Sequence, residues 1–429
     1  MKHFVKLCLI AGVSFIFMAL EARGAETPAD SSFMVPERAI VSGNHVAGRD
    51  LVAILYDKTD LHFSDPNAPR FLFLDRQGKV ALGIGGYVKG TVQYDFNGSI
   101  DDGASFVNYD IPVPNDPARR QQFWGNVNHS TIFLQMVGRS SRFGYYQLYI
   151  QTNFTGNGKT GYGVKVKQAY ASLGNVTMGL TRSTFVDGSA GTPVIDDQGP
   201  SGEAAGKNVL VRYAKSFGKG FRVAAGIEMP DVSVTANSSV EKISQRVPDI
   251  PVNFQYSWGG SHIRLTGLLR NMAYRDLVAG KNNIATGWAV QLSGVQDVAG
   301  MFDIFYQGAY GRGYGRYVND LEGNGFDLVA GREPGRMTVP KTCNFEIGAR
   351  CNLSSKCFLA AAYSQVRTFG IGYLGGDTYR YSQYATLSGF YDIIPDFRIG
   401  AEYIFGTRTN YSGESGKANR IMAMIQYSF

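Results

Sequence analysis

The chain of 429 residues lacks three features that mark common protein classes. No uninterrupted apolar run of about 18 residues occurs, which excludes a membrane-spanning helix. No run of basic residues occurs either, and the net charge of +7 is dispersed along the chain, which argues against a nucleic-acid-binding surface. Cysteine is scarce, with four residues, and the spacing of the cysteines does not fit a zinc site.

Glycine and tyrosine, by contrast, are abundant. The chain has 53 Gly and 25 Tyr, while only 44% of its residues are hydrophobic. This composition suits a large β-barrel whose interior holds water. Two or three soluble all-β domains are the plainer alternative at this length.

The first 24 residues are typical of a secretory signal peptide. Lys2 and Lys6 precede an apolar run from Leu7 to Leu20, and small residues follow that run. We therefore predict that residues 1–24 direct export and are removed.

Residues 25–79 contain several prolines and little strand periodicity. We expect them to form an irregular periplasmic arm with order at residues 71–74; a disordered tail is the alternative for residues 25–50.

The segment from Val80 to Phe96 carries the clearest structural signal. Its even positions are apolar residues or glycine, and its odd positions include Lys89, Gln93 and Asp95. This alternation lasts longer than a usual soluble strand, and its apolar face ends in aromatic residues. Because unpaired backbone groups in hydrocarbon cost several kcal/mol each, such a strand requires a closed barrel.

Fifteen further segments have the same character, and sixteen is an even number, as in bacterial barrels. Tight turns alternate with long polar loops, a pattern typical of outer-membrane barrels rather than soluble sandwiches. We therefore predict an all-β fold over residues 80–429: a 16-stranded antiparallel transmembrane β-barrel in the outer membrane of a Gram-negative bacterium. The further segments are 131–139, 142–154, 162–173, 176–185, 209–217, 221–228, 251–257, 262–270, 286–295, 301–310, 342–351, 357–367, 378–392, 397–408 and 420–429.

Alternation also predicts a basic inner face. Basic residues outnumber the acidic ones there, which are Asp95, Glu228, Asp303, Glu346 and Glu402. An excess of positive charge along a water-filled pore raises the local concentration of anions. We expect passive diffusion of small hydrophilic solutes with a mild preference for anions. The alternative is that these charges pair across strands or lie at the rims, and that conductance is unselective. The basic residues are Lys89, Arg139, Lys165, Lys167, Arg212, Arg222, Arg264, Arg270, Arg350, Arg398, Arg408 and Arg420.

One long loop is a candidate constriction. Residues 186–208 follow the fifth predicted strand, and loops of this length without regular structure are often functional. We expect this loop to fold inward, with Asp187, Asp196, Asp197 and Glu203 facing the basic side chains of the inner face. An extracellular loop that contacts a neighbouring subunit is the alternative.

Other chemistry has weak support. Cys351 and Cys357 flank a predicted hairpin that would place them opposite each other, so an exported chain could form a structural disulfide there. His129 and Ser130 invite comparison with barrel lipases, but no Asp or Asn partner is assignable. We expect no enzyme activity, no cofactor and no metal site.

The chain resembles the DcaP-like trimeric porins of Gram-negative outer membranes. The similar pieces occur in order from about residue 80 to the end, and each piece is short. They are LGIGGYVK at 82–89, QAYA at 168–171, TRSTFVD at 181–187, GPSG at 199–202, VPDIP at 247–251, LLR at 268–270, GRGYGRY at 311–317, GAEYIFG at 400–406, ANR at 418–420 and YSF at 427–429. The closing YSF also resembles the assembly signal of outer-membrane barrels.

The resemblance implies a homotrimer that passes small, often anionic solutes such as dicarboxylates, with an inward loop after the fifth strand. Three departures are evident. The family's N-terminal coiled coil is replaced here by the proline-containing arm. Gln151 and Asn153 stand where family members tend to have carboxylates, and Arg182 replaces a usual aromatic residue. An outer-membrane barrel that acts mainly in adhesion through its long loops remains an alternative.

Overall fold

The computed structural model describes residues 39–43, 47–57, 61–100, 105–158 and 161–429. The predicted signal peptide at 1–24 lies outside these residues, as does the start of the predicted arm. Among the described residues, no helix has both the length and the apolar content that crossing a membrane requires.

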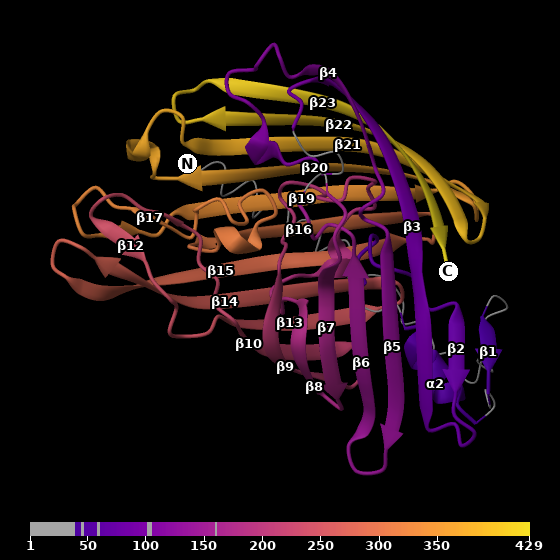
Figure 1. Ribbon diagram of the computed structural model, residues 1–429. Helices are drawn as coiled ribbons and strands as arrows, with labels where there is room; N and C mark the ends of the chain where they lie inside the picture. Colours follow the sequence, from indigo (N-terminus) through magenta and orange to yellow (C-terminus); the bar gives the residue numbers. More distant parts are fainter. Residues whose placement is uncertain (1–38, 44–46, 58–60, 101–104, 159–160) are drawn as a thin grey trace. The chain divides into compact units, whose positions relative to one another are not determined.

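Sixteen antiparallel strands close into a barrel, as predicted (Figure 1). Closure comes from β3, which pairs with β5 on one side and with β23 on the other. A closed ring pairs the backbone groups that a lipid layer cannot satisfy. The barrel strands are β3 (Val80–Asn97), β5 (Thr131–Ser140), β6 (Gly144–Asn153), β7 (Lys165–Leu173), β8 (Val176–Arg182), β9 (Lys207–Phe217), β10 (Phe221–Glu228), β13 (Ile250–Trp258), β14 (Ser261–Asp276), β15 (Lys281–Val298), β16 (Phe302–Arg312), β19 (Lys341–Asn352), β20 (Cys357–Phe369), β21 (Tyr379–Ile394), β22 (Phe397–Asn410) and β23 (Ser415–Ser428).

All sixteen predicted segments form strands, although several strands run further toward the long loops. β14 continues to Asp276, beyond the predicted end at Arg270. β4 (Arg120–Asn126) was not predicted; it pairs with the upper part of β3, while β5 pairs with the lower part. β4 and β5 therefore act as one barrel strand that is interrupted at residues 127–130.

Strand alternation separates a lipid-facing surface from an inner face. In β3, Val88 and Val92 are 55% and 47% exposed, whereas Lys89 and Gln93 are 6% and 2% exposed. Apolar residues outside and polar residues inside are what an outer-membrane barrel requires. The period of two places the predicted basic residues on the inner face of the strands.

The predicted arm is not irregular, and this expectation was wrong. It contains β1 (Ile40–Ser42), α2 (Arg49–Leu55) and β2 (Phe71–Leu74). β2 pairs with β3 and β1 pairs with β2, beside the lower end of β3 (Figure 1). The helix buries Leu51, Val52 and Leu55 against β2, β3 and β5. A helix of seven residues and strands of three and four are too short to show a period in the sequence.

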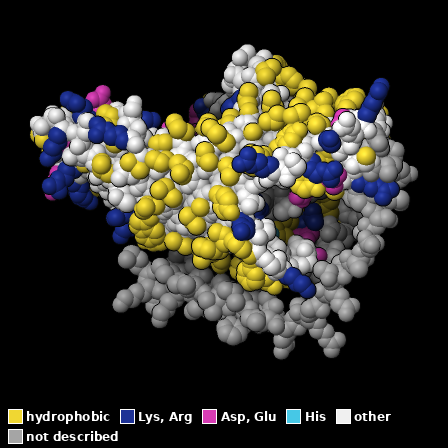
Figure 2. Space-filling model, turned by 90° about the horizontal axis from the view of Figure 1, so that it is seen from below, with side chains coloured by type: hydrophobic (Ala, Val, Ile, Leu, Met, Phe, Trp, Pro, Cys, Tyr) yellow, Lys and Arg dark blue, Asp and Glu magenta, His cyan; other side chains and the backbone are white. Residues whose placement is uncertain are grey.

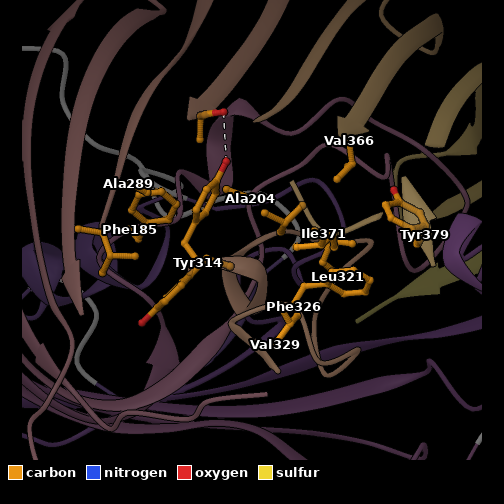
Figure 3. Close-up of a cluster of buried hydrophobic side chains, with 14 residues drawn as sticks. Phe185, Ala204, Ala289, Tyr314, Leu321, Phe326, Val329, Val366, Ile371 and Tyr379 are labelled. Carbon is orange, nitrogen blue, oxygen red and sulfur yellow. Dashed lines mark hydrogen bonds between the residues drawn. The ribbon is translucent and has the colours of Figure 1, made fainter. Parts of the chain in front are cut away.

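The short turns and the long loops lie at opposite rims, but two long loops turn into the barrel. Loop A (residues 183–206) joins β8 to β9, and loop B (residues 313–340) joins β16 to β19. Tyr314 of loop B is fully buried with Phe185 of loop A in one apolar cluster (Figure 3). Tyr317 of loop B is also fully buried in this cluster. Part of the interior is therefore packed, and the expectation of a lumen that holds only water was wrong there.

The remaining elements are short. β12 (Val240–Lys242) extends the pairing of β14, and β11 (Val234–Thr235), β17 (Leu328–Ala330) and β18 (Met337–Thr338) form a separate small sheet. Single 3-10 turns occur at η2 (Asn108–Asp110), η3 (Gly188–Ala190), η4 (Gly315–Tyr317) and η5 (Gly372–Leu374).

Candidate functional site

The inner face of the barrel divides into two parts that differ in how far the loops cover them. The covered wall is the inner face of β14 to β23 and of β3, where most inward side chains are buried. The basic wall is the inner face of β7 to β10, where inward residues such as Ser172, Thr177 and Arg212 stay partly accessible. The open part of the lumen therefore lies along the basic wall.

Loop A folds inward and binds the covered wall through its first acidic residue. Asp187 is fully buried; its Oδ2 lies 2.9 Å from His262 Nε2 and accepts a hydrogen bond of 2.7 Å from the Ser293 hydroxyl. Arg264 Nη1 lies 3.6 Å from the other carboxylate oxygen. Burial alone would raise the pKa of Asp187, but Arg264 and His262 together hold it below its ordinary value. The carboxylate is therefore ionised and fixed to β14 and β15.

Further contacts continue this attachment around the covered wall. Thr192 donates its hydroxyl and its backbone N–H to Glu346 of β19, at 2.7 and 3.1 Å. The backbone N–H groups of Ile195 and Asp196 donate to Glu402 of β22, at 2.6 and 3.1 Å. Loop A thus follows the covered wall strand by strand, and two of the predicted lumenal carboxylates serve as its acceptors.

The last acidic residues of loop A also have specific partners. Lys89 Nζ of β3 donates to Asp197 Oδ1 at 2.8 Å and to the Ile195 carbonyl at 2.9 Å. Burial, reinforced by the neighbouring Glu402, raises the pKa of Asp196 above its ordinary value. Glu203 Oε1 lies 3.3 Å from His62 Nε2. Asp187 and Asp197 therefore face two of the predicted lumenal bases, Arg264 and Lys89, on the covered wall, while Glu203 lies beside the N-terminal segment.

Four predicted pore-lining bases lie on the inner face but are buried beneath loops. Arg270 is fully buried between Asp249 and Asp327, at 3.0 and 2.7 Å. Arg420 is also fully buried, and its Nε lies 2.6 Å from Asp95 Oδ1. Lys89 and Arg264 bind loop A as described above. These side chains hold loops to the wall, which the alternation of the strands cannot reveal.

Four other predicted bases lie near the rims. At the short-turn rim, Arg139 pairs with Asp50 of α2, Arg350 with Asp303 and Arg398 with Asp392. On the long-loop side, Arg408 donates to the Tyr109 carbonyl. Each of these four side chains has a partner nearby. For these four residues, the structure matches the alternative that the charges pair across strands or lie at the rims.

The remaining predicted bases, Lys165, Lys167, Arg212 and Arg222, belong to the basic wall. Two residues that the sequence did not assign, Arg182 and Lys207, join them, and these two pair across β8 and β9. Within the described part of the chain, Lys165, Lys167 and Lys207 form no ion pair. The inner-face lysines without an ion pair therefore lie on β7 and β9, and Asp65, Asp197 and Glu322 are within electrostatic reach of Lys167.

Sequence patterns could not place these two residues. Arg182 follows Met178 and Leu180 at even positions of β8, and Met178 is 63% exposed on the outer face. The strand ends at Arg182, so its side chain leaves the alternation and reaches Asp65 in the lumen, at 3.0 Å. Lys207 lies two residues before the predicted start of the strand at Val209, so the sequence assigned it to the loop.

A cavity of about 710 Å³ lies at the long-loop side. Its lining includes Arg332 and Arg408, together with the rings of Tyr109, Tyr373 and Tyr379. Arg332 stacks 4.7 Å above the Tyr373 ring, and Arg408 stacks at the same distance above Tyr109. Elsewhere on the molecule, Figure 2 shows a hollow edged by basic and acidic side chains beside a broad field of hydrophobic ones.

The proposed disulfide is not formed. Within the described residues, Cys343, Cys351 and Cys357 form no disulfide. The strand register places Leu359, not Cys357, opposite Cys351, so the two cysteines are diagonal neighbours. Diagonal Cβ atoms lie roughly 7 Å apart, beyond the reach of about 4 Å that a disulfide needs.

The contacts of Ser130 and His129 do not support the comparison with barrel lipases either. The Ser130 hydroxyl donates to the Val127 carbonyl at 2.7 Å and accepts from the Lys89 N–H at 3.0 Å. His129 Nδ1 lies 3.4 Å from Asp197, which Lys89 also binds. Within the described residues, no group of three or more His, Cys, Asp or Glu side chains is placed to hold a metal ion.

The model of the DcaP outer membrane protein family matches residues 75–429. The chain belongs to this family. Its barrel is similar to the outer membrane channel DcaP of Acinetobacter baumannii, with 18% identity and a TM-score of 0.71 over 82% of this chain and 98% of that one. It is also similar to a loop-deletion mutant of OmpT of Vibrio cholerae, with 13% identity and a TM-score of 0.54 over 82% and 100% of the two chains. A third similar structure is an anion-selective porin from Comamonas acidovorans, with 11% identity and a TM-score of 0.52 over 82% of this chain and 100% of that one. No curated protein matches the chain.

Membership of the DcaP family confirms the predicted family, the outer-membrane location and the porin-type barrel, and places the chain among non-enzymatic proteins. The family match begins at residue 75. The N-terminal unit of β1, α2 and β2, with the segment that joins α2 to β2, therefore lies before the part of the chain that the DcaP family shares.

Proposed function

We propose that this DcaP-family protein is a passive diffusion porin that prefers small anions, including dicarboxylates. One observation carries the proposal: the basic wall faces the open part of the lumen, while the acids of loop A are bound to the covered wall and the N-terminal segment. A solute that passes through the barrel thus meets Lys165, Lys167 and Arg212 of the basic wall. Positive charge on a low-dielectric wall concentrates anions and speeds their entry.

The arrangement differs from a symmetric charged ring. The bases of the covered wall are neutralised at short range, for example Arg270 by two carboxylates. Their electrostatic field is therefore largely cancelled beyond a few ångströms. The field of Lys165 and Lys167 extends further into the lumen, because these side chains form no ion pair. We infer a mild preference for anions, because the uncompensated charges number only a few and physiological salt screens them over about 8 Å.

The test is the conductance of single channels in planar bilayers. The wild type should show stepwise openings, and Lys165→Gln together with Lys167→Gln should lower the permeability ratio of chloride to potassium. Lys215→Gln is the matched control, because Lys215 belongs to β9 but is exposed on the outer surface. A permeability ratio that is equal in both variants would refute the role of the basic wall, and an absence of openings in the wild type would refute the porin.

The assembly and the orientation belong to the same proposal. The resemblance to trimeric porins supports a homotrimer in outer-membrane lipid, and the short-turn rim with the N-terminal unit would face the periplasm. Chemical cross-linking in membranes should give a trimer band. Protease added to intact cells should leave the N-terminal unit uncut.

A further inference from the structure

Residues 61–66, which precede β2, lie in the interior of the barrel. Asp65 binds Arg182 at the end of β8, and Phe63 packs on Phe358 of β20 and on Phe390 of β21, with ring centroids 6.0 and 5.2 Å apart. β8 is the fifth and β20 the thirteenth of the sixteen barrel strands, so these contacts are on opposite sides. Residues 61–66 therefore cross the lumen, beneath loop A.

The segment is a compact turn rather than a loose connection. The His62 N–H donates to Asp65 Oδ2 and the Asp65 N–H donates to the His62 carbonyl, both at 3.0 Å. The Ser64 carbonyl accepts a hydrogen bond of 3.1 Å from the Tyr87 hydroxyl of β3. Pro66 is buried next to the turn, and a proline reduces the number of conformations that must be lost on docking. The turn therefore holds the carboxylate of Asp65 in a fixed place.

The environment of Asp65 is that of a bound anion. Its side chain is only 6% exposed, and Arg182 Nη1 lies 3.0 Å away. Burial alone would raise its pKa, but Arg182, then Lys207 and His62, lower the pKa to about 2. Lys167 is also within electrostatic reach of Asp65, as it is of Asp197 and Glu322. One carboxylate of the chain thus occupies the most basic part of the lumen.

We propose that Lys167, Arg182 and Lys207 form a carboxylate-binding site in the channel, and that the chain's own Asp65 occupies it as a tethered competitor. This inference rests on the proposed function and adds a specific site to it. A permeating carboxylate reaches the site when the turn swings away, and the turn closes again when the solute has left. The chain is attached on both sides of the turn, which makes such a motion reversible: α2 stays packed on β3 and β5, and β2 stays paired with β3.

The site is distinct from the buried ion pairs of the covered wall. Arg270 and Arg420 bind carboxylates of loops and strands that are fully enclosed. Arg182 is 20% exposed and faces the accessible basic wall, and its carboxylate partner comes from outside the family's common region. Replacement of Asp65 by a solute carboxylate therefore requires movement of one short turn and leaves the barrel intact.

The test uses the full-length channel in planar bilayers with succinate as the probe. Asp65→Asn removes the competing charge with almost no change of shape, and Asp65→Glu retains the charge. We expect succinate to block the chloride current of Asp65→Asn at a concentration about ten-fold below that of the wild type, and Asp65→Glu to behave like the wild type. Asp75→Asn is the control, since Asp75 lies in the turn between β2 and β3 and its carboxylate accepts from the Lys79 and Val80 N–H groups. It should leave the blocking concentration unchanged.

Each outcome has one meaning. A larger chloride current in Asp65→Asn with an unchanged blocking concentration of succinate would show that Asp65 acts only as a countercharge, and would overturn the site. Equal behaviour of Asp65→Asn and Asp75→Asn in channels that still prefer anions would overturn the site but leave the porin intact. Addition of Arg182→Gln to Asp65→Asn should restore the high blocking concentration, and failure to do so would also overturn the site.

Discussion

Arg270 offers the sharpest test of how loop B is held inside the barrel. Its guanidinium is fully buried on β14 and donates to Asp249 at 3.0 Å and to Asp327 of loop B at 2.7 Å. It also donates to the carbonyls of Gly313 and Asp231, at 2.8 and 2.7 Å. One side chain thus joins loop B to a barrel strand and to the segment after β10.

The change Arg270→Gln leaves two carboxylates without the cation that compensates them. Removal of one partner from a buried ion pair typically costs about 3–5 kcal/mol, because the remaining charge stays buried and unpaired. Burial already raises the pKa of Asp249. Protonation of one carboxyl group would therefore recover part of the loss. We expect the lower half of this range near neutral pH and a smaller loss at acidic pH.

The assay is urea unfolding of the barrel reconstituted in detergent micelles, with single-channel recording in parallel. Arg270→Gln should lower the free energy of unfolding by about 3 kcal/mol and should produce noisy, larger openings, because loop B detaches. Arg275→Gln is the matched control on the same strand, since Arg275 is exposed. Asp327→Asn in the Arg270→Gln background should restore part of the stability. A loss below about 1 kcal/mol, which is typical of a surface pair, would refute the role assigned to Arg270.

Three further changes test the remaining contacts. Gly202→Ala should destabilise loop A by roughly 1–3 kcal/mol, because a Cβ atom there would lie 2.1 Å from the Phe345 carbonyl oxygen, and differential scanning calorimetry would measure it. Glu402→Gln should increase open-channel noise, because the N–H groups of Ile195 and Asp196 would lose a charged acceptor; a noise spectrum equal to that of Glu414→Gln would contradict this. The folded-state pKa of Asp65 is lowered to about 2, so its docking free energy is fully present above the ordinary value and is lost only as the pH falls through about 2. Succinate block should therefore not gain affinity between pH 8 and pH 4 through this group, and a gain that Asp65→Asn abolishes would show that its pKa is not lowered.

The barrel could be predicted from the sequence because the alternation along each strand shows which side chains face lipid and which face the lumen. Val88 and Lys89 differ in chemistry at adjacent positions, and that difference is local information. Sixteen such segments with alternating turn lengths suffice for strand number, closure and the inner position of the basic residues.

The arrangement of the lumen depends on contacts between distant segments, which a local pattern does not contain. Arg270 and Lys167 both belong to the inner face, yet only the fold of loop B makes one a buried anchor and leaves the other on the open side. Tyr314 and Tyr317 occur in a glycine-rich loop without a period, so their burial had no signal. The pattern did not place Arg182 because the strand ends there, and it did not place Asp65 because that residue lies in a short turn just before Pro66 and Pro69.

The zero-current potential of the wild-type channel across a gradient of potassium chloride tests the central claim most directly. With the open lumen bounded by the basic wall, chloride should carry more current than potassium, and the potential should have the sign of an anion-selective channel. A potential of zero, or one of the opposite sign, would contradict the account.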